Sequence, residues 1–388
     1  MPPRTQVPAT TPVAPVAPVP SGPPVPPRRP QLKPALRRLW RDEATLQLGL
    51  DPAYAVVIGG LDPLAARMVE SLDGTRDLSG VLTAATRLGV ERWRADEILA
   101  LLGRAGVLDD GAADRRVLRT LDRQERDRLA PDMAAASVTG ESNDGGVAAL
   151  ARRRNSVVSV HGAGRVGASV ASLLAAAGVG GLVVEDAGTT RLADAAPAGL
   201  SVQDEGARRQ DAALRAARRV APSVRARLRP PVQPDIAVVA VVGALDPRLP
   251  DRLVRRGVAH LFASVREGTG IVGPLVLPGR SSCQRCHDLH RSDRDPGWPT
   301  IAAQLSGTAS QSTAACDVVL ATAVAAHAAI QVLAFLDGGG GAGDRSDTAP
   351  RERLPAVDGT LEIARADGRL RRRSWTRHPL CGCAWPGD

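Results

Sequence analysis

The chain has 388 residues, of which 44% are hydrophobic and only 2% aromatic. This length predicts two or three domains, and the apolar content is sufficient for a sizeable core of Ala, Val and Leu. The formal net charge of +9 is carried almost entirely by arginine, because Lys33 is the sole lysine. No basic patch interleaved with aromatic residues accompanies this charge, so it does not predict nucleic-acid binding.

Three sequence features predict a cytoplasmic protein. No run of about 18 uninterrupted apolar residues is present, which argues against a transmembrane span. The segment after Met1 has no apolar core of the kind that signal peptides contain. Five cysteines, grouped as two close pairs plus Cys316, suit a metal site in a reducing compartment better than a disulfide framework.

The N-terminal part predicts a small α+β module behind a disordered tail. Residues 1–35 are rich in Pro, Ala and Val, which is typical of extended, unfolded chains. Residues 36–110 predict a winged-helix-like module with strands at 45–49, 53–58 and 107–108 and helices starting near Leu64, Asp77 and Asp96. Such a module either binds an extended peptide along its strand edge or serves only for packing or dimerisation. Residues 111–154 are expected to be a linker containing one charged helix, over 117–133.

From residue 155 to the C-terminus, strand and helix patterns alternate, which predicts an α/β domain with a Rossmann-like, doubly wound sheet. Strands are expected at 156–160, 181–186, 235–242, 260–265 and 269–279. Helices are expected at 167–179, 211–220, 251–256 and 316–336, followed by a flexible loop at 338–343 and a terminal hairpin and tail within 354–380.

A glycine motif follows the first strand of this domain. Gly162, Gly164 and Gly167 form GxGxxG directly before a helix, where backbone N–H groups can bind a phosphate. Glu185 and Asp186 end the next strand, where an acidic side chain would bind ribose hydroxyls. The pattern therefore predicts a nucleotide-binding fold, with NAD, FAD and ATP all open.

Two cysteine pairs predict a structural zinc site. The ligands would be the four thiolates of Cys283, Cys286, Cys381 and Cys383, if the C-terminus folds back on the domain. A redox CxxC is the alternative, but the thioredoxin-like context that it needs is absent. The nearby histidines are further candidate ligands: His287, His290 and His378.

These motifs together resemble the ThiF/MoeB family, the adenylyltransferases related to ubiquitin-activating enzymes. The resemblance covers about 60% of the chain. Residues 204–209, which read DEGARR, are similar to that family's D-x-G-x-x-K element, with Arg209 at the lysine position. The run GPLVLPGRSSCQRC resembles the family's entry to its first cysteine pair.

The resemblance implies MgATP use and adenylation of the C-terminal carboxylate of a small carrier protein or peptide. The glycine motif would bind phosphate and Asp186 the ribose, Arg209 would replace the phosphate-binding lysine, and Asp246 would hold magnesium. The family's N-x-x-R-Q segment is not recognisable between Asp186 and Asp204, where Arg191 is only a loose stand-in. Arg165 interrupts the family's glycine doublet, and Asp246 lacks the usual D-x-x-D-N setting.

A winged-helix-like module fused to a ThiF-like domain also resembles the leader-peptide-binding partner proteins of azole-forming peptide biosynthesis. This resemblance implies an alternative function, a catalytically degenerate scaffold that presents a precursor peptide to a separate YcaO-type cyclodehydratase. An NAD(P)-dependent oxidoreductase would explain the glycine motif but not the cysteine pairs. The sequence leaves open whether the chain forms a homodimer and whether Cys316 is reactive or a small buried apolar residue.

Overall fold

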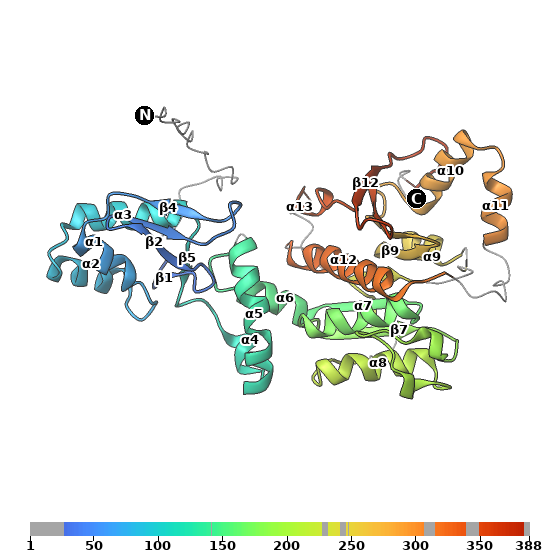
Figure 1. The fold of residues 1–388 in the computed structure, drawn as a ribbon, viewed down its shortest axis with the longest axis horizontal. Helices are drawn as coiled ribbons and strands as arrows, with labels where there is room; N and C mark the ends of the chain where they lie inside the picture. The colour runs from blue at the N-terminus through green and yellow to red at the C-terminus, as the bar shows by residue number, and fades with distance from the viewer. Residues whose placement is uncertain are drawn as a thin grey trace, which may run out of the picture. The chain divides into compact units, whose positions relative to one another are not determined.

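The computed structural model describes residues 27–140, 142–226, 232–240, 246, 248–305, 315–338 and 349–383. By its internal contacts the chain divides into two compact units, residues 1–148 and 149–388 (Figure 1). The segments expected to be a disordered tail and a flexible loop lie mostly outside the described residues, at 1–26 and 339–343. The domain boundaries expected at 35, 110 and 154 stay predictions.

The first unit holds two small sheets and a layer of helices. Strands β2 (Arg38–Asp42), β3 (Thr45–Leu48) and β4 (Val56–Ile58) form an antiparallel sheet in that order, and β1 (Pro30–Leu32) pairs antiparallel with β5 (Leu108–Asp110). The helices are α1 (Pro63–Glu70), α2 (Leu78–Arg87) and α3 (Arg92–Arg104). Asp62 and Asp77 cap α1 and α2 by accepting backbone N–H groups.

The sequence pattern located most of these elements. The strand expected at 53–58 begins only at Val56, because the residues before it form a turn closed by bonds from Tyr54 and Ala55 N–H to the Asp51 carbonyl. The third helix begins at Arg92 rather than near Asp96. Strands β1 and β2 were not predicted, and β1 lies inside the segment whose composition indicates a tail.

The charged segment after this module forms two helices rather than one, α4 (Arg116–Arg119) and α5 (Arg123–Thr139). Helix α5 is hydrogen-bonded to the module: the Ser137 hydroxyl donates to the buried Asp109 carboxylate at 2.8 Å, and the Lys33 ammonium donates to the Ser137 carbonyl. The next helix, α6 (Val147–Asn155), leads into the first strand of the second unit.

The second unit is built on a seven-stranded sheet with the order β12-β11-β10-β9-β8-β6-β7. Its strands are β6 (Val157–His161), β7 (Gly181–Glu185), β8 (Ile236–Val239), β9 (Ala259–Arg266), β10 (Thr269–Val276), β11 (Gly359–Ala364) and β12 (Leu370–Ser374). The four strands β7, β6, β8 and β9 are parallel, and β10, β11 and β12 continue antiparallel from β9. This mixed α/β sheet is the Rossmann-like fold that the alternating pattern predicts.

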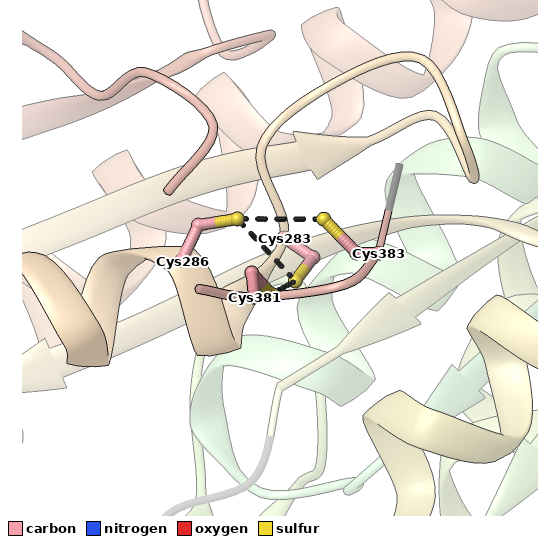
Figure 2. Close-up of side chains that lie close together, drawn as sticks. All are labelled: Cys283, Cys286, Cys381 and Cys383. Carbon is pink, nitrogen blue, oxygen red and sulfur yellow. Dashed lines mark hydrogen bonds between the residues drawn. The ribbon is translucent and has the colours of Figure 1, made fainter. Parts of the chain in front are cut away.

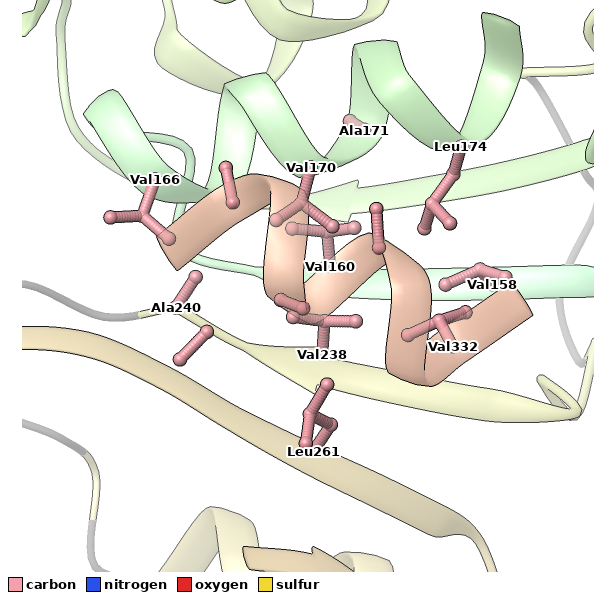
Figure 3. Close-up of a cluster of buried hydrophobic side chains, with 14 of the residues drawn as sticks. Val158, Val160, Val166, Val170, Ala171, Leu174, Val238, Ala240, Leu261 and Val332 are labelled. Atoms are coloured by element: carbon pink, nitrogen blue, oxygen red, sulfur yellow. The ribbon is translucent and has the colours of Figure 1, made fainter. Parts of the chain in front are cut away.

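Apolar side chains on both faces of the parallel strands explain how helices cover the sheet. Val158 and Val160 of β6 belong to the main core with α7 (Arg165–Ala176) and α12 (Val318–Asp337), as Figure 3 shows. Ala237 and Val239 of β8 face the opposite side, where α9 (Arg248–Arg255) packs. Helix α8 (Arg209–Val220) lies beside α7 (Figure 1).

Helix α12 is long and apolar enough to cross a membrane by length and composition, but half of it is buried inside the unit. Its buried residues, among them Val324, Ala328 and Val332, pack in the main core, so it is the central core helix of the unit. Helix α10 (Gln284–Arg294) begins at the first cysteine pair, and α11 (Trp298–Leu305) follows it. Neither was predicted, because α10 is strongly polar and α11 buries no residue.

Candidate functional site

The glycine motif forms the turn from β6 into α7, and each glycine meets a different steric demand. Gly162 has φ +92°, a conformation that side chains disfavour. A Cβ on Gly167 would lie 1.9 Å from the Gly162 carbonyl oxygen, so only glycine fits there. Gly164 caps α7, and a Cβ added to it would meet nothing within 4 Å. Gly164 itself is buried, so this space shows room for a small side chain at the start of α7.

The two acidic residues at the end of β7, Glu185 and Asp186, have different partners. The Asp186 carboxylate accepts backbone N–H groups from Ala163 and Gly188, both at 2.7 Å, so it braces the glycine turn. The Glu185 carboxylate lies 3.2 Å from Nδ1 of His161, its direct neighbour in the parallel register. This hydrogen bond from His161 lowers the pKa of Glu185.

A cavity of about 470 Å³ lies where these strands end, the position at which open α/β sheets bind ligands. It brings together four of the predicted site residues: Gly162, Glu185, Asp186 and Asp246. Arginines also line it, namely Arg208 and Arg252. The cavity thus combines the first glycine of the turn, carboxylates and guanidinium groups.

Asp246, the predicted magnesium ligand, lines this cavity but already has protein partners. One carboxylate oxygen accepts the Arg248 N–H at 2.9 Å, and the other accepts from the Arg252 guanidinium at 2.9 Å. The backbone hydrogen bond, together with Arg252, lowers its pKa. The carboxylate is therefore charged at neutral pH, as a metal ligand needs to be, and is paired with a cation.

Arg209, predicted to bind phosphate, forms an ion pair with Asp194. Its Nη2 lies 2.8 Å, and its Nε 3.0 Å, from the same Asp194 carboxylate oxygen. Its Nη1 lies 4.0 Å from the Asp186 carboxylate. Both side chains of the pair are largely buried, and Arg209 does not line the cavity.

The neighbouring residues of the predicted phosphate site are also paired within the protein. Arg191 is exposed, with its Nε 3.9 Å from Asp194, and it is not a cavity-lining residue. Asp204 accepts from Ser201 and from Arg215, at 2.8 Å and 3.0 Å. Arg165 donates to the Cys316 carbonyl at 2.6 Å. None of these three residues is among those that line the cavity.

Two residues of this site were missed from the sequence. His161 directly precedes Gly162, and its pairing with Glu185 follows from the parallel register of β6 and β7, which the strand pattern implies. Asp194 lies in a short 3₁₀ helix, Leu192–Asp194, in an irregular segment with no periodic pattern. No sequence signal places it against Arg209.

The two cysteine pairs come together, although they are separated by almost a hundred residues. Figure 2 shows Cys283 and Cys286, at the start of α10, facing Cys381 and Cys383. Sulfur–sulfur distances are 3.8 Å for Cys283–Cys286 and 3.4 Å for both Cys283–Cys381 and Cys286–Cys383. All four sulfur atoms lie within 4.8 Å of one another.

This cluster fits a tetrahedral zinc ion. Four thiolates about 2.3 Å from one zinc stand roughly 3.8 Å apart, close to the observed spacing. The hydrogen bond from Cys283 lowers the pKa of Cys286 to about 4, and the same contact raises that of Cys283. Burial raises the pKa of Cys383 to about 12. Four adjacent thiolates would repel one another strongly if no cation were bound. A divalent cation bound between them would stabilise all four in the charged form.

The histidines near the cysteines have other partners. His287 stacks on Trp375, with ring centroids 4.6 Å apart, and His378 Nε2 lies 2.9 Å from the Asp293 carboxylate. His290 Nε2 lies 3.0 Å from the Thr376 carbonyl. Cys316 is half-buried against the main core, and burial raises the pKa of its thiol, as expected for a packing residue.

Comparison with known proteins now decides the family. The model of the ThiF family matches residues 142–354, more than half of the chain. The chain belongs to the ThiF family. No curated protein sequence matches this ThiF-family chain.

Solved structures similar to this ThiF-family chain extend the likeness over both units. E. coli MccB crystallised with succinimide is 15% identical, with a TM-score of 0.65, over 91% of this chain and 99% of that one. E. coli MccB with AMPCPP and MccA gives a TM-score of 0.66 at 15% identity, over 92% and 99%. PaaA gives 0.64 at 15% identity, over 88% and 99%. At this identity the likeness shows a shared fold.

Proposed function

We propose that this ThiF-family protein is a peptide-binding scaffold that presents a precursor leader peptide to a separate YcaO-type cyclodehydratase and does not itself adenylate the peptide. The observation that carries the proposal is the Arg209–Asp194 ion pair. Arg209 stands at the position of the family's phosphate-binding lysine. Its guanidinium lies 2.8 Å from the Asp194 carboxylate, so its charge is already paired. A triphosphate would have to displace that carboxylate before Arg209 could bind it.

Two observations support a peptide partner: a protein of the same fold has been solved with a peptide bound, and the first unit has an exposed strand edge. The microcin C7 biosynthetic enzyme MccB, which shares the fold, has a solved structure in complex with N-formylated MccA. In this chain β4 is an edge strand of its sheet; Val57 within it is 48% exposed, and Tyr54 just before it is 42% exposed. Helix α3 begins next to this strand, because Arg94 donates to the Gly60 carbonyl at 2.8 Å. An extended peptide can pair with such an edge by strand addition.

The second candidate is an active ThiF-type adenylyltransferase that activates the C-terminal carboxylate of a carrier protein or peptide. It is favoured by the cavity of about 470 Å³ that Gly162 of the glycine turn lines together with Asp246. ATP would then bind over the glycine turn, with Mg²⁺ at Asp246. In either function the four cysteines would hold a structural zinc ion, since a site closed by four protein ligands leaves no position for substrate. Both functions belong in the cytoplasm.

Calorimetric titration of the full-length protein with the precursor peptides encoded beside its gene tests the proposal. We expect saturable binding that Val57→Lys weakens by about tenfold or more, because the new charge would meet the bound strand. Val220→Lys, at an equally exposed valine of α8, is the matched control and should bind like the parent. Absence of binding to every such peptide, or equal binding by both variants, would refute the peptide-edge assignment.

A further inference from the structure

The open edge of the seven-stranded sheet carries a run of arginines. Strand β12 reads Leu-Arg-Arg-Arg-Ser, pairs only with β11 within the described residues, and all five of its residues are exposed. An edge strand of this kind presents unpaired backbone N–H and C=O groups to any extended chain that approaches it.

The register shows which backbone groups are free. Trp375 N–H donates to the Asp358 carbonyl, and Ala364 N–H donates to the Arg369 carbonyl, so these opposite residues are hydrogen-bonded pairs of the β11–β12 ladder. Because hydrogen-bonded and non-bonded pairs alternate in an antiparallel ladder, the backbone groups of residues 370, 372 and 374 point to the open edge.

The side chains of β12 divide between the two faces of the sheet. Arg372 bends back on its own unit, where its guanidinium donates to the carbonyls of Pro355 at 2.9 Å and Val357 at 3.1 Å. Arg371 and Arg373 lie on the other face, with Trp375. Arg372 therefore fastens the strand, while its two neighbours are available on the surface.

Further arginines gather on that second face. Arg291 and Arg294 of α10 lie with their guanidinium carbons 5.1 Å and 5.5 Å from the centre of the Trp375 ring, and Arg373 lies at 5.8 Å. Burial lowers the pKa of Arg291, and the positive charges of Arg266 and Arg373 lower it further, so these groups are close enough to repel one another. We call the following set the arginine face: Arg266, Arg291, Arg294, Arg371 and Arg373.

Nearby carboxylates pair with only two of the five arginines of the arginine face. Asp288 lies 3.0 Å from Arg291, and Glu362 lies 3.4 Å from Arg373. No ion pair with a described carboxylate is present for Arg266, Arg294 or Arg371. A partner that brings negative charge would therefore relieve repulsion as well as gain attraction.

We infer that β12 and the arginine face form a docking surface for an extended acidic peptide segment, which adds to the sheet as a strand beside β12 and places its carboxylates against the arginines. The open backbone groups favour a peptide over a nucleic acid, whose phosphates would use the arginines but not the strand edge. This surface lies on the antiparallel end of the sheet, on different elements from the glycine turn and from the first unit's β4.

The test uses the full-length protein and a fluorescein-labelled peptide of about ten residues that alternates Glu and Val, with a Gln-Val peptide for comparison. We expect the Glu-Val peptide alone to bind, with affinity that falls as salt rises. Arg371→Glu should weaken binding by about tenfold or more, and Arg255→Glu, at an exposed arginine of α9, should leave it within about twofold.

Hydrogen exchange of the complex identifies the binding mode. Strand addition predicts slower amide exchange over residues 368–375 when the Glu-Val peptide is bound. Unchanged melting temperatures of both variants would show that the substitutions act on binding rather than on folding. Equal binding of the two peptides, an equal effect of the two substitutions, or tight binding of a single-stranded oligonucleotide without slower exchange at 368–375 would each overturn the proposal.

Discussion

The guanidinium of Arg209 lies 2.8 Å from the carboxylate of Asp194, and both side chains are largely buried. In the family pattern the position of Arg209 is that of a lysine that binds the phosphates of ATP. Here the positive charge is compensated inside the protein by two charge-assisted hydrogen bonds to one carboxylate oxygen. Under the proposed scaffold function, this pairing reduces the capacity of the site to bind a triphosphate.

Removing the negative charge of Asp194 should restore part of that capacity. Asp194→Asn keeps the side-chain shape and an oxygen that can accept the Arg191 N–H, which the carboxylate accepts at 2.9 Å. We expect the variant to bind ATP about tenfold more tightly than the parent, because one charge-assisted hydrogen bond becomes available to phosphate. Calorimetry with ATP measures the difference.

The matched control is Asp204→Asn, which removes a second buried carboxylate that is paired with an arginine, Arg215, at 3.0 Å. It should leave the ATP affinity unchanged. Equal ATP binding by the parent and by Asp194→Asn would show that the ion pair does not limit the site.

Two glycines of the same turn should respond differently to alanine. Gly167→Ala places a methyl group 1.9 Å from the Gly162 carbonyl oxygen, so we expect a loss of stability of about 2 kcal/mol or more. Gly164→Ala meets nothing within 4 Å, and its melting temperature should stay within a few degrees of the parent. Thermal unfolding of both variants checks this. Equal melting temperatures would contradict the steric account of the turn.

Gly164→Asp tests the same turn as an anion site. Its carboxylate would stand at the N-terminus of α7, where it would repel an incoming phosphate while favouring the helix dipole. Any nucleotide affinity of the parent or of Asp194→Asn should therefore be lost, with the zinc content unchanged. Unaltered nucleotide affinity in the aspartate variant would mean that phosphate binds elsewhere.

The cysteine cluster predicts one zinc ion per chain. Metal analysis of the purified protein should find it, and Cys381→Ser should release it and lower the melting temperature by about 5 °C or more, because metal binding contributes directly to folding. Cys316→Ser, outside the cluster, should keep the metal. A native protein that contains no zinc and whose four clustered thiols react freely would exclude the site.

Buried His260 predicts a loss of stability in mild acid. Desolvation lowers its pKa to about 4, and its Nε2 atom has no partner among the described residues. Between pH 6.5 and about 4 the unfolded chain binds a proton that the native chain excludes, so the free energy of unfolding falls as the pH falls. The full effect is about 3 kcal/mol. His260→Gln should show a flatter pH dependence in denaturant titrations, and an unchanged slope would contradict this origin.

The sequence located the elements whose patterns are local. The strand before Gly162, the helix after it and the strand ending at Glu185 follow from apolar runs and one glycine motif, and all three are present. The zinc site was expected from the two cysteine pairs on the condition that the C-terminus folds back, a condition that spacing alone could not establish for residues 98 positions apart. The hairpin of β11 and β12 was expected, but not its register or its arginine face.

The side-chain pairs of the candidate site could not be predicted, because they join residues that are far apart in the sequence and follow no periodic pattern. Arg209 was expected to bind phosphate from its position in the motif, and this role stays a prediction; its partner Asp194 comes from an irregular segment whose path only the folded chain defines. Likewise, Asp186 was expected to face a ribose, and in the structure it braces the turn through the Ala163 and Gly188 N–H groups. Polar side chains that pair with one another at long range are the part of a site that sequence reasoning finds last.

ATP–pyrophosphate exchange tests the central claim most directly. The assay uses the full-length protein with MgATP, labelled pyrophosphate and each precursor peptide that binds in calorimetry, so that peptide binding and adenylation are measured on the same pair. Exchange requires a reversible attack of the peptide carboxylate on ATP and reports it without any later step. The account predicts peptide binding with no exchange above the level without peptide. Peptide-dependent exchange would contradict the scaffold and establish the protein as an active adenylyltransferase.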